Sequence, residues 1–322
     1  MMTTTTMMAA TRRIDSSSVP LSAASHAPPS REAIDARLLE FRGRRVAVAM
    51  SGGVDSAVAA LRMLDAGAVT IGLSLRLHDP DPCNPGALRA CCPPDDLQAA
   101  RRTAETLDFP FYVLDARDAF DEVVVRPFVR AYLDGRTPNP CVTCNRQVKI
   151  ARLAERARAL GCEVLVTGHY ARSTTDVRDR VRLFRGADRA KDQSYFLFDL
   201  PPSLLEHLLF PLGAMQKDEV RAVARSRRLP IAEKLESQEV CFVGENGAGA
   251  FVERQPEARG DQAGEIVDEY GRVLGEHAGV LHFTVGQRRG LGVAAPHPLH
   301  VLSIDPRARR LVVGPRERLA RR

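Results

Sequence analysis

Tryptophan is absent from the 322-residue chain, and aromatic residues together make up only 5% of it. A surface that stacks unpaired nucleobases on aromatic rings is therefore not expected from the composition. No apolar run reaches the roughly 18 residues that cross a bilayer, so a membrane-spanning helix is excluded. Residues 1–30 lack the apolar core that a signal peptide carries. These absences predict a cytoplasmic protein with no membrane attachment.

Lysine is also scarce, although the chain is basic. Its formal net charge is +6 and its pI is about 9.1. Only four of the 46 basic residues are lysines, namely Lys149, Lys191, Lys217 and Lys234. The arginine excess has two interpretations, a GC-rich genome or an acidic partner such as nucleic acid. Charge alone does not decide between them.

Cysteine occurs seven times, and the odd number argues against the disulfide framework of a secreted protein. The cysteines of a reduced protein need another explanation, such as catalysis or metal binding. The chain length predicts about two domains with room for a small third one. Apolar residues make up 44% of the chain, which is ordinary for a globular protein.

From Arg44 onward, short β-rich runs alternate with helical patterns. Expected strands are 45–50, 70–77, 111–115 and 163–167, and expected helices are 57–66, 95–107, 119–133 and 147–160. This alternation is typical of an α/β fold with a doubly wound parallel sheet, which binds ligands beyond the carboxyl ends of its strands. After about Pro211 an arginine-rich helix (216–228) precedes two expected β-hairpins, 265–275 and 299–313.

The string SGGVDS, Ser51–Ser56, lies between the first expected strand and its helix. Its glycines allow close approach to an anion, and backbone N–H groups at a helix N-terminus bind phosphate oxygens. No lysine follows the glycines, so this is not a Walker loop. Asp55 either holds Mg²⁺ or orients the loop. The string resembles the pyrophosphatase loop of the N-type ATP pyrophosphatases, which cleave ATP between the α- and β-phosphates and activate a carbonyl oxygen as an adenylate.

The second motif is NPCVTCN, Asn139–Asn145, which we expect on a proline-stiffened loop at a helix start. A helix N-terminus lowers a thiol pKa, so these cysteines suit a nucleophile or a metal ligand. A structural zinc site would need a second Cys-x-x-Cys pair, which the sequence lacks. Zinc is therefore the weaker interpretation.

Four further motifs are ambiguous when each is taken alone. Cys241 in SQEVCF reads as a small buried hydrophobe, His169 in TGHY as a structural residue, and KDQSY (191–195) as a solvated loop. The fourth, 283–292, is basic and glycine-rich. Cys83, Cys91 and Cys92 match no metal signature, so we expect them to have a packing role.

Together and in this order, the motifs resemble those of the tRNA-specific 2-thiouridylases, which thiolate the wobble uridine (U34) of certain tRNAs. The resemblance runs from about Arg44 to the C-terminus. It implies an ATP-pyrophosphatase domain (43–212), a small central domain (213–277) and a C-terminal β-barrel (278–322). Residues 1–42 lack periodicity before 34–41, so we expect them to form a disordered leader with a short helix. The family barrel normally continues beyond a string such as 311–317, so we expect either a truncated barrel or a version with a reduced tail that binds tRNA more weakly.

The resemblance also implies residue roles. Cys144 matches the nucleophile position and Cys241 the position that carries the persulfide. ATP would be bound by Ala49, Ser51, Gly52, Gly53, Val54, Asp55 and Ser56, with Leu75 and Gly168 on the adenine and ribose side. The target base would lie against Asn139, Pro140 and Cys141, and tRNA against His169, Lys191, Asp192 and Gln193.

The implied chemistry uses ATP with Mg²⁺, tRNA and a persulfide-donating sulfur-relay protein, and the enzyme acts as a monomer. Adenylation turns the uracil C2 oxygen into a good leaving group. Either Cys144 attacks the Cys241 persulfide and releases sulfide, or the persulfide attacks C2 and Cys144 resolves the product. Both routes end in a Cys144–Cys241 disulfide that must be reduced.

One departure from the family pattern keeps an alternative open. Many members carry aspartate at the position of Cys141, and here three thiols (Cys141, Cys144 and Cys241) are available to hold a [4Fe–4S] cluster. Two other classes share the loop: a small-molecule ligase or amidotransferase, and a non-catalytic RNA-binding protein. The thiols argue against the first and the intact Ser51–Ser56 string against the second.

Overall fold

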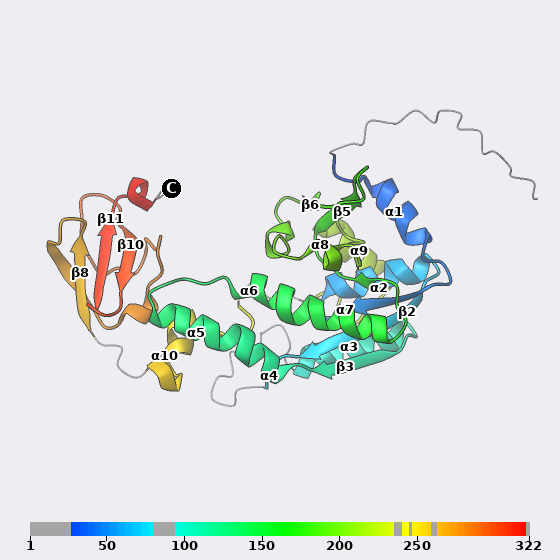
Figure 1. Cartoon of the computed structure of the whole chain (residues 1–322), viewed down its shortest axis with the longest axis horizontal. Helices are drawn as coiled ribbons and strands as arrows, with labels where there is room; N and C mark the ends of the chain where they lie inside the picture. The colour runs from blue at the N-terminus through cyan, green and yellow to red at the C-terminus, as the bar shows by residue number, and fades with distance from the viewer. Residues whose placement is uncertain (1–26, 80–93, 235–239, 245–246, 259–262, 320–322) are drawn as a thin grey trace, which may run out of the picture.

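The structure of the chain, a computed structural model, describes residues 27–79, 94–234, 240–244, 247–258 and 263–319. Figure 1 shows a layered α/β body at one end and a smaller β-sheet at the other, with long helices running between them. Most of the expected leader lies outside the described residues. So do Cys83, Cys91 and Cys92.

A five-stranded sheet in the order β3-β2-β1-β4-β7 forms the centre of the α/β body. Its strands are β1 (Arg45–Ala49), β2 (Val69–Arg76), β3 (Phe111–Asp115), β4 (Leu165–Val166) and β7 (Leu208–Leu209). Every neighbouring pair is parallel, which confirms the predicted fold class. β1 is the middle strand, so the segment that follows it emerges at the centre of the carboxyl edge.

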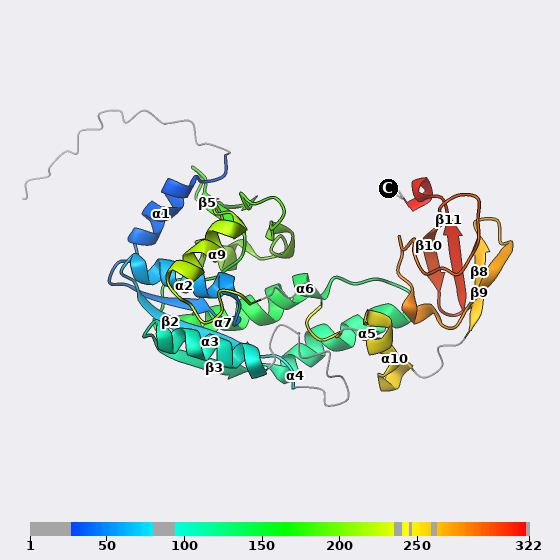
Figure 2. The same cartoon turned by 180° about the vertical axis from the view of Figure 1, so that it is seen from behind.

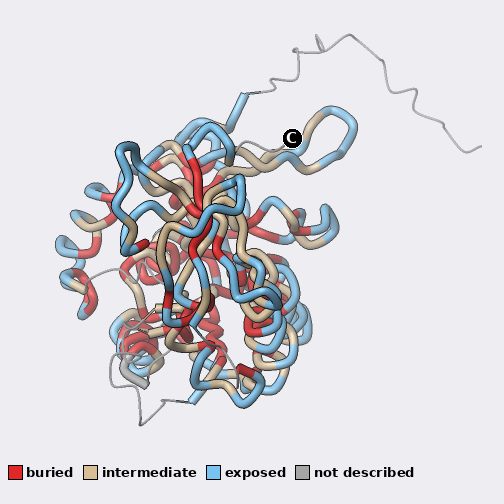
Figure 3. Tube along the Cα trace, turned by 90° about the vertical axis from the view of Figure 1, so that its left-hand side faces the viewer, coloured by how far each residue is buried: buried red, intermediate tan, exposed pale blue. Residues whose placement is uncertain are grey.

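Helices cover both faces of this sheet. Val46 and Val48 of β1 pack with α1 (Arg31–Leu39), α2 (Val54–Asp65), α3 (Pro94–Thr106) and α9 (Lys217–Ser226). Ala47 points to the other face and packs with Phe120, Ile150 and Leu153. Buried stretches therefore run through the interior and exposed ones follow the outer loops (Figure 3). Within the described ranges, no helix combines the length and apolar character needed to cross a bilayer.

Two long helices lie on the second face. One consists of α4 (Arg117–Phe120), a π-helical segment (Asp121–Val125) and α5 (Arg126–Leu133). The other consists of α6 (Pro140–Thr143), a π-helical segment (Cys144–Lys149) and α7 (Ile150–Ala159). π-Helical turns inside longer helices are frequent at functional sites.

The second long helix corrects one expectation, because it begins at Pro140 rather than at residue 147. The Cys-x-x-Cys pair is therefore in the first turns of a helix and not on a loop. Asn139 is the N-cap, and its Oδ1 accepts a hydrogen bond from Cys141 N at 3.2 Å. Pro140 occupies the first helical position, where its fixed φ favours helix initiation. The proline that we interpreted as a loop stiffener is a helix start.

The remaining elements form a hairpin and a second sheet. The hairpin is β5 (Ala171–Thr175) with β6 (Val181–Arg185), followed by a 3₁₀ turn (Ser194–Phe196) and α8 (Pro202–Leu205). After α10 (Gly247–Glu253) and a 3₁₀ turn (Pro256–Ala258), the second sheet contains β8 (Gly264–Asp268), β9 (Val273–His277), β10 (His300–Asp305) and β11 (Arg310–Gly314). Further 3₁₀ turns are Val280–His282 and Arg316–Leu319.

The second sheet has the order β10-β11-β8-β9. Its antiparallel pairs β8–β9 and β10–β11 confirm both predicted hairpins. A parallel pairing of β11 with β8 joins the hairpins around a small core of Ile266, Val301 and Leu311. This pairing runs across the predicted boundary at 277/278, and the division into four segments stays a prediction.

Candidate functional site

The candidate phosphate loop lies at the carboxyl end of β1. Ser51 is exposed, and α2 begins at Val54 with Gly53 as its N-cap. Inside the loop, Ser56 Oγ lies 3.0 Å from Gly53 O and accepts from Ser51 N at 3.2 Å. Because Gly53 has no side chain to cap α2, the first amides of the helix remain available to an anion. The local geometry supports the interpretation of Ser51–Ser56 as an anion-binding turn.

Asp55 connects this loop to α9. Its two carboxylate oxygens accept hydrogen bonds from Lys217 Nζ at 2.7 and 2.8 Å, and Oδ1 also accepts from Tyr170 Oη at 2.9 Å. Lys217 is only 7% exposed, and its backbone N–H donates to Asp188 Oδ2 at 3.0 Å. Figure 2 shows α2 and α9 packed side by side. The loop carboxylate is therefore held by a buried ammonium from another helix.

A second lysine holds the other end of the loop. Lys234 Nζ donates to Gly52 O at 3.0 Å and forms an ion pair with Asp96 of α3. Lys217 and Lys234 were not predicted as site residues. The scarcity of lysine was the signal, because in a chain that uses arginine almost everywhere a lysine marks a position that needs a compact ammonium group.

Gly52 has almost no room for a side chain, which yields a prediction with a matched control. Its φ is +72°, and a Cβ would lie 2.8 Å from the carbonyl carbon of Asp96. Gly43 has a φ of +71° with nothing within 4 Å. We expect Gly43→Ala to lower the free energy of unfolding by about 1 kcal/mol, the cost of a left-handed backbone alone.

We expect Gly52→Ala to cost more and to abolish ATP-dependent activity, because the loop must move away from Asp96. Chemical denaturation and an adenylation assay check both variants. Equal losses of stability and activity in the two variants would contradict the assigned role of the close contact.

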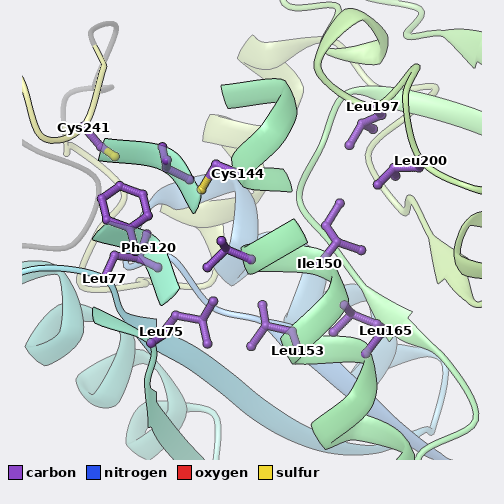
Figure 4. Close-up of a cluster of buried hydrophobic side chains, with 14 of the residues drawn as sticks. Leu75, Leu77, Phe120, Cys144, Ile150, Leu153, Leu165, Leu197, Leu200 and Cys241 are labelled. Carbon is purple, nitrogen blue, oxygen red and sulfur yellow. The ribbon is translucent and has the colours of Figure 1, made fainter. Parts of the chain in front are cut away.

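The other predicted nucleotide residues lie near the loop in different ways. A Cβ on Gly168 would lie 2.8 Å from Asp55 C and from Ser56 N, so this glycine permits the loop to pack on the end of β4. Ala49 is half-buried at the end of β1. Leu75 is 4% exposed and its side chain lies in the apolar core (Figure 4), so any contact with a nucleotide would come from its backbone.

Cys144 and Cys241 come from distant parts of the chain but lie in the same apolar cluster (Figure 4). Cys144 is 4% exposed and Cys241 is 8% exposed. Phe242 anchors the Cys241 segment, because its ring packs edge-on against Phe120 and Phe128 with centroid distances of 5.5 and 5.1 Å. The structure therefore places the two cysteines to which we assigned chemistry in one apolar cluster.

Cys141 is half-buried, one helical turn before Cys144. Among the residues that the structure describes, no three His, Cys, Asp or Glu side chains come together to hold a metal ion. The alternative in which Cys141, Cys144 and Cys241 hold a [4Fe–4S] cluster stays a prediction. Cys162 follows the end of α7 and is buried. Burial raises the pKa of its thiol, which is typical of an inert cysteine.

His169 follows β4, next to the phosphate loop. Burial and, to a smaller extent, the ammonium group of Lys149 lower the pKa of His169 to about 4. The imidazole is therefore neutral at pH 7, and its Nδ1 lies 3.0 Å from Thr167 Oγ1. In the predicted tRNA contact, a neutral ring would act through hydrogen bonds and not as a cation.

The side chains of Asp192 and Gln193 accept hydrogen bonds from backbone N–H groups of the chain. Asp192 Oδ1 accepts from Gly186 N at 2.9 Å and from Ser194 N at 3.2 Å, and Gln193 Oε1 accepts from Tyr170 N at 3.0 Å. Through Tyr170 this segment is connected to Asp55. Lys191 is half-buried in the same segment. These side chains shape the loop from which a partner would be contacted.

Comparison with known proteins identifies the family. Residues 44–245 match the model described as tRNA methyl transferase HUP domain, and residues 251–315 match the tRNA methyl transferase PRC-barrel domain. The tRNA-specific 2-thiouridylase MnmA of Geotalea uraniireducens is 49% identical over 281 residues, which cover 86% of this chain and 74% of that protein. The chain belongs to the tRNA-specific 2-thiouridylase family. The thiouridylase of Geobacter metallireducens is 47% identical, with 88% of this chain and 77% of that protein covered.

Membership in the 2-thiouridylase family confirms the resemblance carried by the motifs. The family models are named after methyl transfer, but the relatives at this identity are named thiouridylases. A small-molecule ligase and a non-catalytic RNA-binding protein are thereby removed as alternatives. Among solved structures, a 4-thiouridine synthetase–RNA complex with bound ATP aligns over 67% of this chain and 47% of that chain, with a TM-score of 0.41 and 16% identity. A sequence identity of 16% does not show that the two proteins share an activity.

Proposed function

We propose that this protein is an ATP-dependent tRNA thiolase that replaces the C2 oxygen of the wobble uridine by sulfur. The observation that carries the proposal is the pairing of an anion-binding loop at the centre of the sheet edge with two cysteines in one adjoining cluster. The names and the identity of the curated relatives support it. The catalytic roles of Cys144 and Cys241 are part of the proposal.

The phosphate loop would bind and activate ATP. Amides of Ser51–Gly53 and the start of α2 would receive the phosphates. Lys217 and Lys234 hold the loop from both sides, through the Asp55 carboxylate and the Gly52 carbonyl oxygen. The uracil C2 oxygen attacks the α-phosphorus, pyrophosphate leaves, and the base carries AMP on C2.

Asp55 accepts two hydrogen bonds from Lys217, which supports its role in orienting the loop. Mg²⁺ in ATP-using sites is held largely by the phosphates and water. We therefore propose that Mg²⁺ enters with the nucleotide.

Sulfur would arrive as a persulfide on Cys241, delivered by a relay protein. In one route the Cys144 thiolate attacks Cys241 Sγ, releases hydrosulfide and forms the Cys144–Cys241 disulfide. Hydrosulfide then adds to C2, and AMP leaves. In the other route the persulfide displaces AMP directly, and Cys144 cleaves the resulting S–S bond. A thiol reductant restores both cysteines in either route.

The burial of both thiols implies a conformational step. At 4% and 8% exposure, neither sulfur of Cys144 and Cys241 is open to a relay protein in this arrangement. The segment that carries Cys241 would have to open for loading. The predicted tRNA contacts at Asn139, Pro140 and Cys141 stand at the start of the Cys144 helix, where an unstacked base would approach.

The direct test is an activity assay on the full chain. We expect 2-thiouridine, detected by mass spectrometry of digested tRNA, when the protein receives ATP, a sulfide source and unmodified tRNA. Omission of ATP should remove the product. Absence of 2-thiouridine with every tRNA offered, under conditions in which a characterised thiouridylase succeeds, would overturn the proposed function.

A further inference from the structure

Two aromatic side chains are exposed to solvent near the helix that contains Cys141 and Cys144. Tyr195 and Phe198 are 61% and 63% exposed, although large aromatic side chains are usually buried. Their ring centroids are 5.8 Å apart with an interplanar angle of 35°, and Phe196 packs edge-on against Tyr195 at 5.7 Å. Exposed rings in mutual contact form a surface and are not scattered apolar residues.

This surface, Tyr195 with Phe198, is fixed next to Cys144. Asn145, the neighbour of Cys144, donates from Nδ2 to Phe196 O at 3.1 Å. Arg146 forms an ion pair with Asp199 at 2.7 Å. The segment between β6 and α8 therefore lies on α6 (Figure 1). The rings occupy a defined position at the predicted base-binding helix.

Exposed arginines lie on the segments that adjoin the rings. Arg146 is half-exposed and pairs with Asp199, the chain neighbour of Phe198. Arg185, at the end of β6, is 71% exposed, and its Nε lies 3.9 Å from Asp192 Oδ2. A nucleobase in RNA has phosphates on both sides, so exposed rings with partly exposed arginines on the adjoining segments suit it in shape and charge.

We infer that Tyr195 and Phe198 form a stacking surface for an unstacked base of the tRNA anticodon loop, beside the target uridine. The inference rests on the proposed function. A uridine that enters the site must leave its stack, and aromatic rings replace the stacking that its neighbour loses. The low aromatic content of the chain had argued against such a surface. Two rings suffice when the fold leaves both exposed.

The experiment measures the affinity of the full chain for an anticodon stem-loop by fluorescence anisotropy. We expect Tyr195→Ala and Phe198→Ala each to weaken binding roughly ten- to a hundredfold, the effect of one stacked base. Tyr195→Phe keeps the ring and should bind normally. Phe198→Leu keeps apolar volume without a ring and should bind weakly. Tyr270→Ala is the matched control, because Tyr270 is 85% exposed in the β8–β9 turn.

A second measurement follows the fluorescence of stem-loops that carry 2-aminopurine on one side or the other of the target uridine. We expect the wild-type protein to quench one of them and Tyr195→Ala to lose the quenching. Unchanged affinity in both alanine variants would overturn the inference. Unchanged affinity together with lost sulfur uptake from a relay protein would also overturn it and assign the rings to protein docking. A wild-type protein that makes 2-thiouridine in either case leaves the proposed function intact.

Discussion

Replacing either Cys144 or Cys241 by serine is expected to lower 2-thiouridine formation by a factor of at least about 10³, the size of effect seen when a covalent nucleophile is removed. A serine hydroxyl carries no persulfide and forms no disulfide, so both sulfur-transfer routes stop. Adenylation should survive, because the phosphate loop belongs to other elements. The measurements are 2-thiouridine by mass spectrometry and tRNA-dependent pyrophosphate release.

The chain contains its own controls for this prediction. Cys162 is buried in the same apolar cluster as Cys144, so Cys162→Ser should keep the activity of the folded fraction. Cys141→Ser should also keep substantial activity under the persulfide mechanism. A single turnover without reductant should leave a Cys144–Cys241 disulfide, visible by peptide mass. Equal inactivity of the Cys141, Cys144 and Cys241 variants would contradict the two-cysteine mechanism.

The second large effect is expected at Lys217. The Lys217→Met variant should lose about 3 kcal/mol of unfolding free energy, because it leaves the Asp55 carboxylate without its buried ammonium partner. We take the lower end of the range for a broken buried pair, since the Asp55 side chain is 28% exposed. Denaturant unfolding monitored by circular dichroism measures this loss.

Arg227 supplies the matched control, because it joins the same two helices as Lys217. Its ion pair with Asp65 links the far ends of α2 and α9, and both side chains are about half-exposed. Screening by water makes such a surface pair worth less than about 1 kcal/mol. We expect Arg227→Met to be nearly neutral. A Lys217→Met variant no less stable than Arg227→Met would contradict the assigned role of the buried pair.

The double variant Asp55→Asn with Lys217→Met separates stability from function. It removes both charges, so it should lose less stability than the sum of the two single changes. It should still fail to adenylate tRNA, because the loop has lost the cation that holds it. Recovery of adenylation along with stability would show that Lys217 acts on folding alone.

Sequence patterns predicted the nucleotide-binding part well, because its signals are local. The strands 45–50 and 70–77 alternate with helical patterns, and Ser51–Ser56 is one continuous string, so the loop and its place after β1 follow from short-range rules. The helix that contains Cys141 and Cys144 begins at Pro140, earlier than the predicted start at residue 147. The capping side chain of Asn139 competes there with the loop tendency of its prolines, and only the formed hydrogen bond decides the outcome.

Contacts between distant residues depend on the path of the whole chain. Asp55 and Lys217 are 162 positions apart, and no periodicity states that this lysine meets that carboxylate. The same holds for the parallel pairing of β11 with β8 and for the two exposed rings at Tyr195 and Phe198. The sequence by itself determined the parallel sheet, the phosphate loop and the cysteines suited to sulfur chemistry. Only the tertiary structure decided which ammonium groups hold the loop, that the two cysteines share one cluster, and which aromatic rings remain exposed, because burial and long-range pairing arise when the helices and sheets pack together.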